Sequence, residues 1–265
     1  MRRKPVFVQF NYPVTQNPDS KTFHLSLPCY NEGDRLPDFL PSLCTAILKS
    51  DLSVEVQIVD DGSEFYHQEH YRNLMGLLRP SFSFLHDTLP LDFNQGKGST
   101  VYAGWDQAKD ADMLVFSDAD GAVGPEEVVR VLKAVNEDPD ADNTLYATSR
   151  IENETTEVHR RALRNIGGLT FRWLRKQLFS FPIEDTQCGF KIVPNAFFKE
   201  YREKLIEPGF AFDIELLYRA QQANLKLKEV PVTWNDIKGG HMSFGNSIAL
   251  FKDLLRLKGT LYKEE

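Results

Sequence analysis

The stretch VFSDADGA (residues 115–122) continues an apolar run at residues 113–116 and ends it with two carboxylates, Asp118 and Asp120. An apolar run of this length is typical of a buried strand in a parallel sheet. Residues i and i+2 of an extended segment point the same way, so both carboxylates can face one ligand. The other interpretation is a solvated loop before a helix, because short acidic motifs recur by chance.

Strand-like and helix-like patterns alternate on both sides of this stretch. Strands are expected at residues 22–27, 54–59, 82–85, 113–117, 145–149, 189–193 and 225–232. Helices are expected at residues 36–49, 71–78, 97–109, 125–136, 161–179, 212–223 and 247–258. This alternation predicts an α/β fold with a mostly parallel central sheet flanked by helices.

The chain is expected to form a single domain, because no linker composition interrupts it. Residues 1–21 are predicted to be an irregular lead-in, and residues 246–265 a C-terminal helix. The domain at residues 22–245 is expected to have two functional halves, residues 22–122 and residues 123–245.

Composition limits the functional classes. The net charge of −7 argues against nucleic acid as a partner, which would require clustered basic residues. The three cysteines have no paired spacing, which favours reduced thiols and a cytoplasmic location. No apolar run approaches the roughly 18 residues of a membrane-spanning helix.

Acidic residues follow three of the predicted strands. These residues are Glu32, Asp60, Asp61, Asp118 and Asp120. Parallel strands bring their carboxyl ends to one edge of the sheet, where ligands bind in open α/β folds. Such crowding of negative charge requires an offset, and a divalent cation such as Mg²⁺ or Mn²⁺ provides one. The sequence therefore predicts a metal site at this edge.

A glycine-rich turn, NQGKG at residues 94–98, precedes a predicted helix. Glycines allow a phosphate to approach the backbone, and a helix N-terminus favours anions. Lys97 could neutralise a diphosphate there, although a plain turn before a helix explains the same residues. The stretch matches neither the GxGxxG nor the P-loop pattern.

Basic residues are concentrated between residues 150 and 176. Arginine pairs bidentately with phosphate, so Arg150, Arg160 and Arg164 are candidates for binding an acceptor phosphate. Aromatic and leucine side chains interleave with them, and a leucine stripe recurs at residues 250–257. These stripes favour peripheral membrane contact, although packing against the core is the more common role of such a stripe.

Several motifs in this order resemble a known family, the inverting GT-A glycosyltransferases of family 2. The closest likeness is to polyprenyl-phosphate sugar transferases of the dolichyl-phosphate glucosyltransferase and mannose synthase kind. The matching stretches cover roughly residues 22–245. They are LPCYNEGDRLP (27–37), VQIVDDGS (56–63), NQGKGSTVYAG (94–104), FSDADGA (116–122), SR (149–150), EDTQCGFKI (184–192), GFAFDIELLYRAQ (209–221) and EVPVTWNDIKGG (229–240).

The resemblance implies a role for each matching residue. Nucleotide-binding residues would be Pro28, Tyr30, Glu32, Asp60, Lys97 and Asp118. Asp118 and Asp120 would form the DxD pair that holds the metal and the donor sugar. Asp185 falls where this fold often has its catalytic base, and Gln187 would shape the acceptor side. His241 departs from the family pattern, which has lysine there. It is a candidate third metal ligand or diphosphate contact, although a loop histidine without either role is the other interpretation. The resemblance further implies that residues 22–122 are the nucleotide-sugar half of the domain and residues 123–245 the acceptor half.

The expected reaction is inverting, metal-dependent transfer of a sugar, with glucose favoured, from a nucleotide-diphosphate sugar to a polyprenyl-phosphate acceptor. UDP-glucose is the first donor candidate and GDP-mannose the second. Two alternatives remain open. One is transfer to a soluble hydroxyl or phosphate acceptor, and the other is a non-catalytic nucleotide-sugar-binding protein. A nucleotidyltransferase is disfavoured, because residues 28–31 read PCYN where that class has a glycine-rich loop. A cytoplasmic protein with peripheral contact at the inner face of the membrane fits these expectations.

Overall fold

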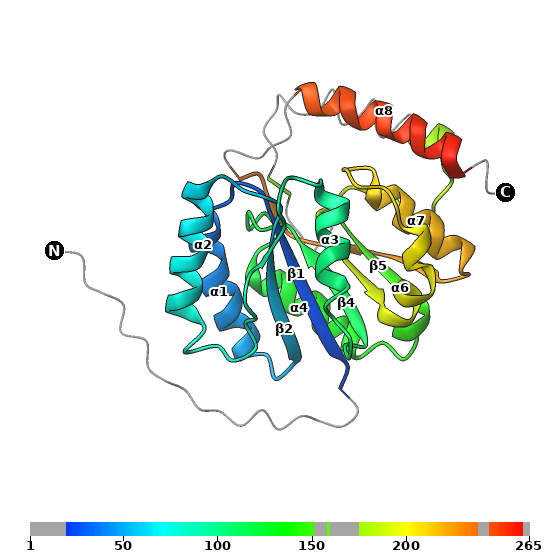
Figure 1. Ribbon diagram of the computed structural model, residues 1–265. Helices are drawn as coiled ribbons and strands as arrows, with labels where there is room; N and C mark the ends of the chain where they lie inside the picture. The colour runs from blue at the N-terminus through cyan, green and yellow to red at the C-terminus, as the bar shows by residue number, and fades with distance from the viewer. Residues whose placement is uncertain (1–19, 151–157, 160–174, 238–243, 262–265) are drawn as a thin grey trace.

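The computed structural model describes residues 20–150, 158–159, 175–237 and 244–261. A seven-stranded sheet forms the centre, in the order β3-β2-β1-β4-β7-β5-β8 (Figure 1). Its strands are β1 (Thr22–Cys29), β2 (Ser53–Asp60), β3 (Leu89–Pro90), β4 (Met113–Ser117), β5 (Thr144–Ser149), β7 (Phe190–Pro194) and β8 (Lys226–Pro231). A small parallel pair joins β6 (Val158–His159) to β9 (Trp234–Asn235).

The sheet is mostly parallel, as the strand-helix alternation predicts. Strand β1 pairs in parallel with β2 and β4, and β5 pairs in parallel with β8. Only β7 runs antiparallel, between β4 and β5. Strands β1, β2, β4 and β5 therefore end at one edge, called the carboxyl edge below, and β7 begins there.

Helices cover both faces of the sheet (Figure 1). Along β4, Met113 and Val115 enter one hydrophobic cluster, and Leu114 and Phe116 enter the other. This alternation explains the continuous apolar run, because a strand covered on both faces needs apolar side chains at every position. The helices are α1 (Leu36–Leu48), α2 (Phe65–Leu78), α3 (Lys97–Trp105), α4 (Pro125–Asn136), α6 (Asn195–Tyr201), α7 (Phe212–Gln222) and α8 (Phe244–Leu261), with 3-10 turns at Ala141–Asn143 and Arg202–Lys204.

The C-terminal helix α8 packs beside the carboxyl edge (Figure 1). Its Leu254, Leu257 and Leu261 are buried in a third cluster with Phe179 and Ile214. Part of the leucine stripe that favours membrane contact is therefore core, as the alternative interpretation holds. Leu255 is 48% exposed. In the described part of the chain, none of the helices has the length and apolar character needed to cross a membrane.

Several expected boundaries are wrong. The strand expected at residues 82–85 is absent, since Leu85 makes only an isolated bridge to Val56, and the edge strand is Leu89–Pro90 instead. Phe82 and Leu85 are apolar because they are buried, and they do not extend the ladder.

Helix positions also differ from the expectation, and α8 (Phe244–Leu261) extends three residues beyond each expected end. Helix α2 begins at Phe65, six residues before its expected start. The pattern missed these turns because the first buried residue of the helix is Tyr71, so no apolar periodicity marks residues 65–70. Helix α3 ends at Trp105, and α6 (Asn195–Tyr201) was not expected. Of the helix expected at 161–179, only residues 175–179 lie within the described residues, and 175–178 are helical.

Candidate active site

The carboxyl edge brings the acidic strand ends together. Asp60 ends β2, Glu32 follows β1, and Asp118 and Asp120 follow β4. Burial raises the pKa of Glu32 to about 7, and the nearby charges of Asp120 and Asp118 add to the shift against the opposing effect of Arg35. Burial, then the charge of Asp118, also raises the pKa of Asp120. This edge therefore concentrates negative charge that a cation would relieve.

Two of these carboxylates have a cationic partner, since Arg35 pairs with Glu32 and Lys97 pairs with Asp118. The Lys97 ammonium lies 2.5 Å from Asp118 Oδ1, and its side chain is only 18% exposed. Burial acts against the charged ammonium, but the carboxylates of Asp118 and Asp213 outweigh it and raise the pKa of Lys97. Lys97 at the start of α3 and Asp118, the first aspartate of the DxD pair, therefore form an ion pair.

Gly189 fits against Asp118 without any space for a side chain. A Cβ at Gly189 would lie 1.8 Å from Asp118 Oδ2. The Asp118 amide donates to the Gly189 carbonyl at 2.8 Å, because Ser117 pairs with Phe190 at the adjacent position of the ladder. The antiparallel entry of β7 therefore sets the position of the Asp118 carboxylate.

The second aspartate is fixed by its own turn. Asp120 Oδ1 accepts a hydrogen bond from the Ala122 amide at 2.9 Å. Gly121 adopts a φ of 76°, a left-handed conformation that glycine takes without strain. This turn directs the chain from β4 toward α4 and leaves Asp120 partly buried beside Glu32.

Asp61 holds the glycine-rich turn, a role that the sequence analysis did not assign. Its Oδ1 accepts from the Gln95 amide at 2.6 Å, and its Oδ2 accepts from the Gly96 amide at 3.1 Å. Burial raises the pKa of Asp61, and these hydrogen bonds oppose the shift. The second aspartate of the DDGS stretch was the available signal.

The segment after β1 is tied to the end of β2. Asn31 has a φ of 57°, and its amide donates to Ser63 Oγ at 2.9 Å. The Ser63 amide in turn donates to Asp60 Oδ1 at 3.0 Å. Tyr30 is left 40% exposed at this edge, and Pro28 lies inside β1. The residues predicted to hold the nucleotide are therefore close neighbours in the fold.

Asp185, the predicted catalytic base, pairs with Arg150, which was predicted to bind the acceptor phosphate. The Arg150 guanidinium donates to both oxygens of Asp185, at 2.7 and 2.8 Å, and the Arg150 amide donates to Asp185 Oδ2 at 2.9 Å. Burial would raise the pKa of the Asp185 carboxyl, but these contacts hold it well below its usual range. Arg150 also lies over the ring of Trp234. Gln187 donates from its side-chain amide to the Phe210 carbonyl at 3.2 Å.

Three predicted site residues, Arg160, Arg164 and His241, lie outside the described residues. Within the described ranges, no group of three or more histidine, cysteine, aspartate or glutamate residues is arranged to hold a metal ion.

A buried ion pair beneath the site was also not predicted from the sequence. Lys191 of β7 lies 2.5 Å from Asp213 Oδ1 of α7, with side chains that are 0% and 5% exposed. The Lys191 ammonium also donates to the Cys188 carbonyl at 2.9 Å. Lys97 and Lys191 both lie near the Phe116 ring, at 5.4 and 5.5 Å from its centroid. The sequence feature that could have indicated this pair is the lysine at position 191, inside the strand predicted at residues 189–193.

This sheet order, with one antiparallel strand beside an acidic carboxyl edge, defines a GT-A glycosyltransferase fold. Glucosyl-3-phosphoglycerate synthase from Mycobacterium tuberculosis, solved with Mn²⁺, UDP and phosphoglyceric acid, matches with a TM-score of 0.61. The match covers 90% of this chain and 79% of that one, at 15% identity. A second structure of that enzyme, with phosphoglyceric acid, matches with a TM-score of 0.66 at 13% identity and covers 96% and 86% of the two chains.

Sequence comparison identifies the family. The family described as glycosyl transferase family 2 matches residues 25–203, so the chain belongs to this family and is a glycosyltransferase. It is 31% identical to a dolichyl-phosphate beta-glucosyltransferase of Dictyostelium discoideum over 262 residues, covering 96% of this chain and 78% of the relative. The human dolichyl-phosphate beta-glucosyltransferase is 29% identical, over 91% of this chain and 76% of that protein.

Proposed function

We propose that this chain transfers glucose from UDP-glucose to the phosphate of a polyprenyl phosphate. The observation that carries the proposal is the similarity to dolichyl-phosphate beta-glucosyltransferases along 96% of the chain. The acidic carboxyl edge agrees with it, since Lys97 and Asp118 place both signs of charge where a sugar diphosphate would bind.

Asp118 and Asp120 are the proposed ligands of a Mg²⁺ or Mn²⁺ ion. Hard divalent cations prefer carboxylate oxygens, and the raised pKa of Asp120 indicates a local excess of negative charge. The Asp118 side chain is 40% exposed, so it is accessible to an ion. When bound, the ion would neutralise charge on the leaving diphosphate. His241 stays a candidate third ligand.

The chain's own residues have proposed roles around the donor. Lys97 places its ammonium beside the leaving diphosphate, where it stabilises the developing charge. The nucleoside would be held by residues at the ends of β1 and β2, namely Pro28, Tyr30, Glu32 and Asp60.

A phosphate acceptor explains why Asp185 can pair with Arg150 instead of acting as a catalytic base. A phosphate has a second pKa of about 6, so it is already anionic near neutral pH and needs no base to attack the sugar. Asp185 therefore orients Arg150, and Arg150 with Arg160 and Arg164 binds the acceptor phosphate. Attack from the face opposite the leaving diphosphate inverts the anomeric carbon. Gln187 borders this acceptor side.

The test compares Asp120→Asn with Asp185→Asn in single-turnover glucose transfer from radiolabelled UDP-glucose. We expect Asp120→Asn to lose about 100-fold or more, the scale of removing an electrostatic contact to developing charge. Asp185→Asn should lose less. Equal or reversed losses would contradict an orienting role for Asp185.

The same assay distinguishes the acceptor classes. The product from a polyprenyl phosphate partitions into butanol, whereas a glucosylated soluble phosphomonoester stays in water. Labelled product in water alone would favour the soluble-acceptor alternative. Calorimetric titration with UDP-glucose and GDP-mannose, with Mn²⁺ and then with EDTA, identifies the donor. Donor binding without turnover of either acceptor would favour a non-catalytic binding protein.

A further inference from the structure

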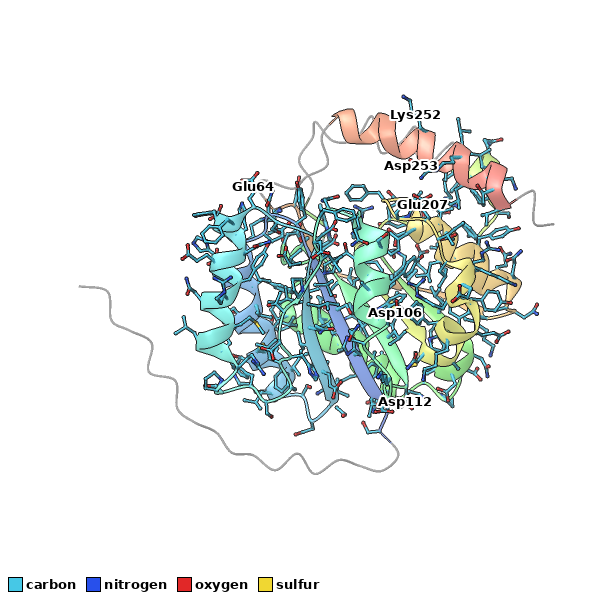
Figure 2. All side chains as sticks on the ribbon, in the orientation of Figure 1. Glu64, Asp106, Asp112, Glu207, Lys252 and Asp253 are labelled. Carbon is cyan, nitrogen blue, oxygen red and sulfur yellow. The ribbon has the colours of Figure 1, made fainter. Side chains whose placement is uncertain are left out.

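The C-terminal helix contacts the glycine-rich turn through one buried carboxylate. Glu207 lies before α7 and is 4% exposed, although it carries a charge. Arg256 of α8 donates to both of its oxygens, each at 3.0 Å. A buried carboxylate is costly unless it is paired, so this contact fixes the side chain of Glu207. Figure 2 shows Glu207 beneath α8, on the side of the helix that also carries Asp253.

The backbone next to Glu207 packs directly on the start of α3. A Cβ at Gly98 would lie 2.3 Å from the Glu207 carbonyl oxygen, and a Cβ at Gly96 would lie 2.5 Å from the Pro208 carbonyl oxygen. The Ser99 amide donates to that Pro208 oxygen at 3.2 Å. Glycine at residues 96 and 98 therefore serves this close packing as well as any approach of a ligand.

Residues 207–209, called the clamp segment here, are held from two helices. The Glu207 amide donates to Glu215 Oε2 of α7 at 2.8 Å, and the Gly209 amide donates to Glu207 Oε1 at 3.2 Å. Arg256 of α8 supplies the positive charge, which it shares with Asp253 at 3.2 Å. Loss of that charge would leave Glu207 buried beside other carboxylates, and the clamp segment would have to move toward water.

We infer that Arg256 and Glu207 are positioning residues through which α8 sets the conformation of the glycine-rich turn and thereby the affinity for the nucleotide diphosphate. The inference rests on the proposed function only for the identity of this ligand. A movement of the clamp segment reaches Gly96 and Gly98 directly, because no space separates them. Lys97, which pairs with Asp118, stands between these two glycines.

The test uses hydrogen exchange of the full chain carrying Arg256→Gln. We expect amide exchange at Ser99 and Gly209 to accelerate about fivefold, which corresponds to the loss of roughly one screened ion pair. Amides of β1 and β4 should be unchanged. Lys252→Gln is the matched control, since the Lys252 side chain is exposed and points away from Glu207 (Figure 2), so this change removes the same charge without breaking the contact. Arg256→Lys should restore most of the protection.

A binding measurement completes the test. The Kd for UDP should rise about fivefold in Arg256→Gln by the same loss of one ion pair, and return toward the wild-type value in Arg256→Lys. Unchanged exchange at Ser99, or acceleration spread evenly over the sheet, would overturn the inference. So would an equal effect of Lys252→Gln. If the wild-type chain binds no UDP, the proposed function fails. The exchange data then still show whether α8 controls the conformation of the glycine-rich turn.

Discussion

Gly189 is the residue on which the position of Asp118 depends most directly. The adjacent antiparallel strand brings its Cα against the carboxylate, and no L side chain fits there. The sequence predicts only that a strand begins at Gly189, so the reason for this glycine becomes visible when β7 is placed beside β4.

Gly189→Ala should displace the Asp118 carboxylate and leave the rest of the sheet in place. We expect kcat/KM for glucose transfer to fall about 100-fold, as for loss of an electrostatic contact. Gly76→Ala is the control, because a Cβ there meets nothing within 4 Å and α2 should gain about 1 kcal/mol of helix propensity. Wild-type kinetics in Gly189→Ala would show that Asp118 does not act in the reaction.

The raised pKa of Glu32 predicts a pH dependence of stability. The carboxyl has its ordinary pKa of 4.5 in the unfolded chain and a pKa of about 7 in the folded one, so between these values the folded chain binds more protons. Stability from this group is therefore complete below pH 4.5 and is lost as the pH rises to 7. Glu32→Gln should remove this loss, worth up to about 3 kcal/mol.

Urea unfolding of the wild type and Glu32→Gln between pH 4 and 8, in EDTA, measures this difference. The variant should gain stability relative to the wild type as the pH rises. A difference that is constant with pH would mean that Glu32 titrates normally.

Between elements, buried ion pairs fix how strands and helices meet. Lys191 and Asp213 join β7 to α7 with almost no exposed side-chain surface. Residue types alone predict that both should be at the surface, since lysine and aspartate are rarely buried unless paired. The sequence indicates β7 and α7 separately, and only their packing explains the two charges.

Lys191→Met should therefore destabilise the chain by about 3 kcal/mol or more, because Asp213 is left buried without its partner. The double variant Lys191→Met, Asp213→Leu should be more stable than the single variant, since no uncompensated charge remains. Urea midpoints of the single and double variants test this. If the double variant is the less stable one, the pair contributes through more than charge compensation.

Over the whole molecule, a net charge of −7 opposes binding to an anionic membrane. Contact with lipid would therefore depend on a local basic surface, such as the one predicted between residues 150 and 176. Leu255 at 48% exposure adds one apolar side chain on α8, whereas Leu254 and Leu257 are committed to the core.

We predict that the protein floats with vesicles containing anionic lipid at low salt and less at high salt. Screening causes the difference, because the Debye length falls from about 10 Å at 0.1 M to about 3 Å at 1 M. Vesicles of neutral lipid are the control. Absence from the vesicle fraction at both salt concentrations would exclude peripheral membrane contact.

The α/β class, the buried β4 strand and the grouping of Asp60, Asp118 and Glu32 at one edge were all predictable from the amino-acid sequence. Apolar runs, the alternation of strands and helices, and acidic residues after strands are local features of the sequence. Because parallel strands end at the same edge of a sheet, these local features also predict that the acidic residues lie together. The same features gave a wrong prediction at residues 82–85. The apolar residues there are buried, but they form only an isolated bridge and no strand.

The pairing of charges, in contrast, depends on how the elements pack and was not predictable from the sequence. Arg150 with Asp185, Lys97 with Asp118 and the contact of Arg256 with Glu207 join residues that are 35, 21 and 49 positions apart in the numbering. The periodicity of the sequence does not indicate contacts between such distant residues. These contacts depend on the antiparallel entry of β7 into the sheet and on the packing of α8. The physical reason is that a buried charge must find its counterion in space, and the sequence pattern records only that the charge is there.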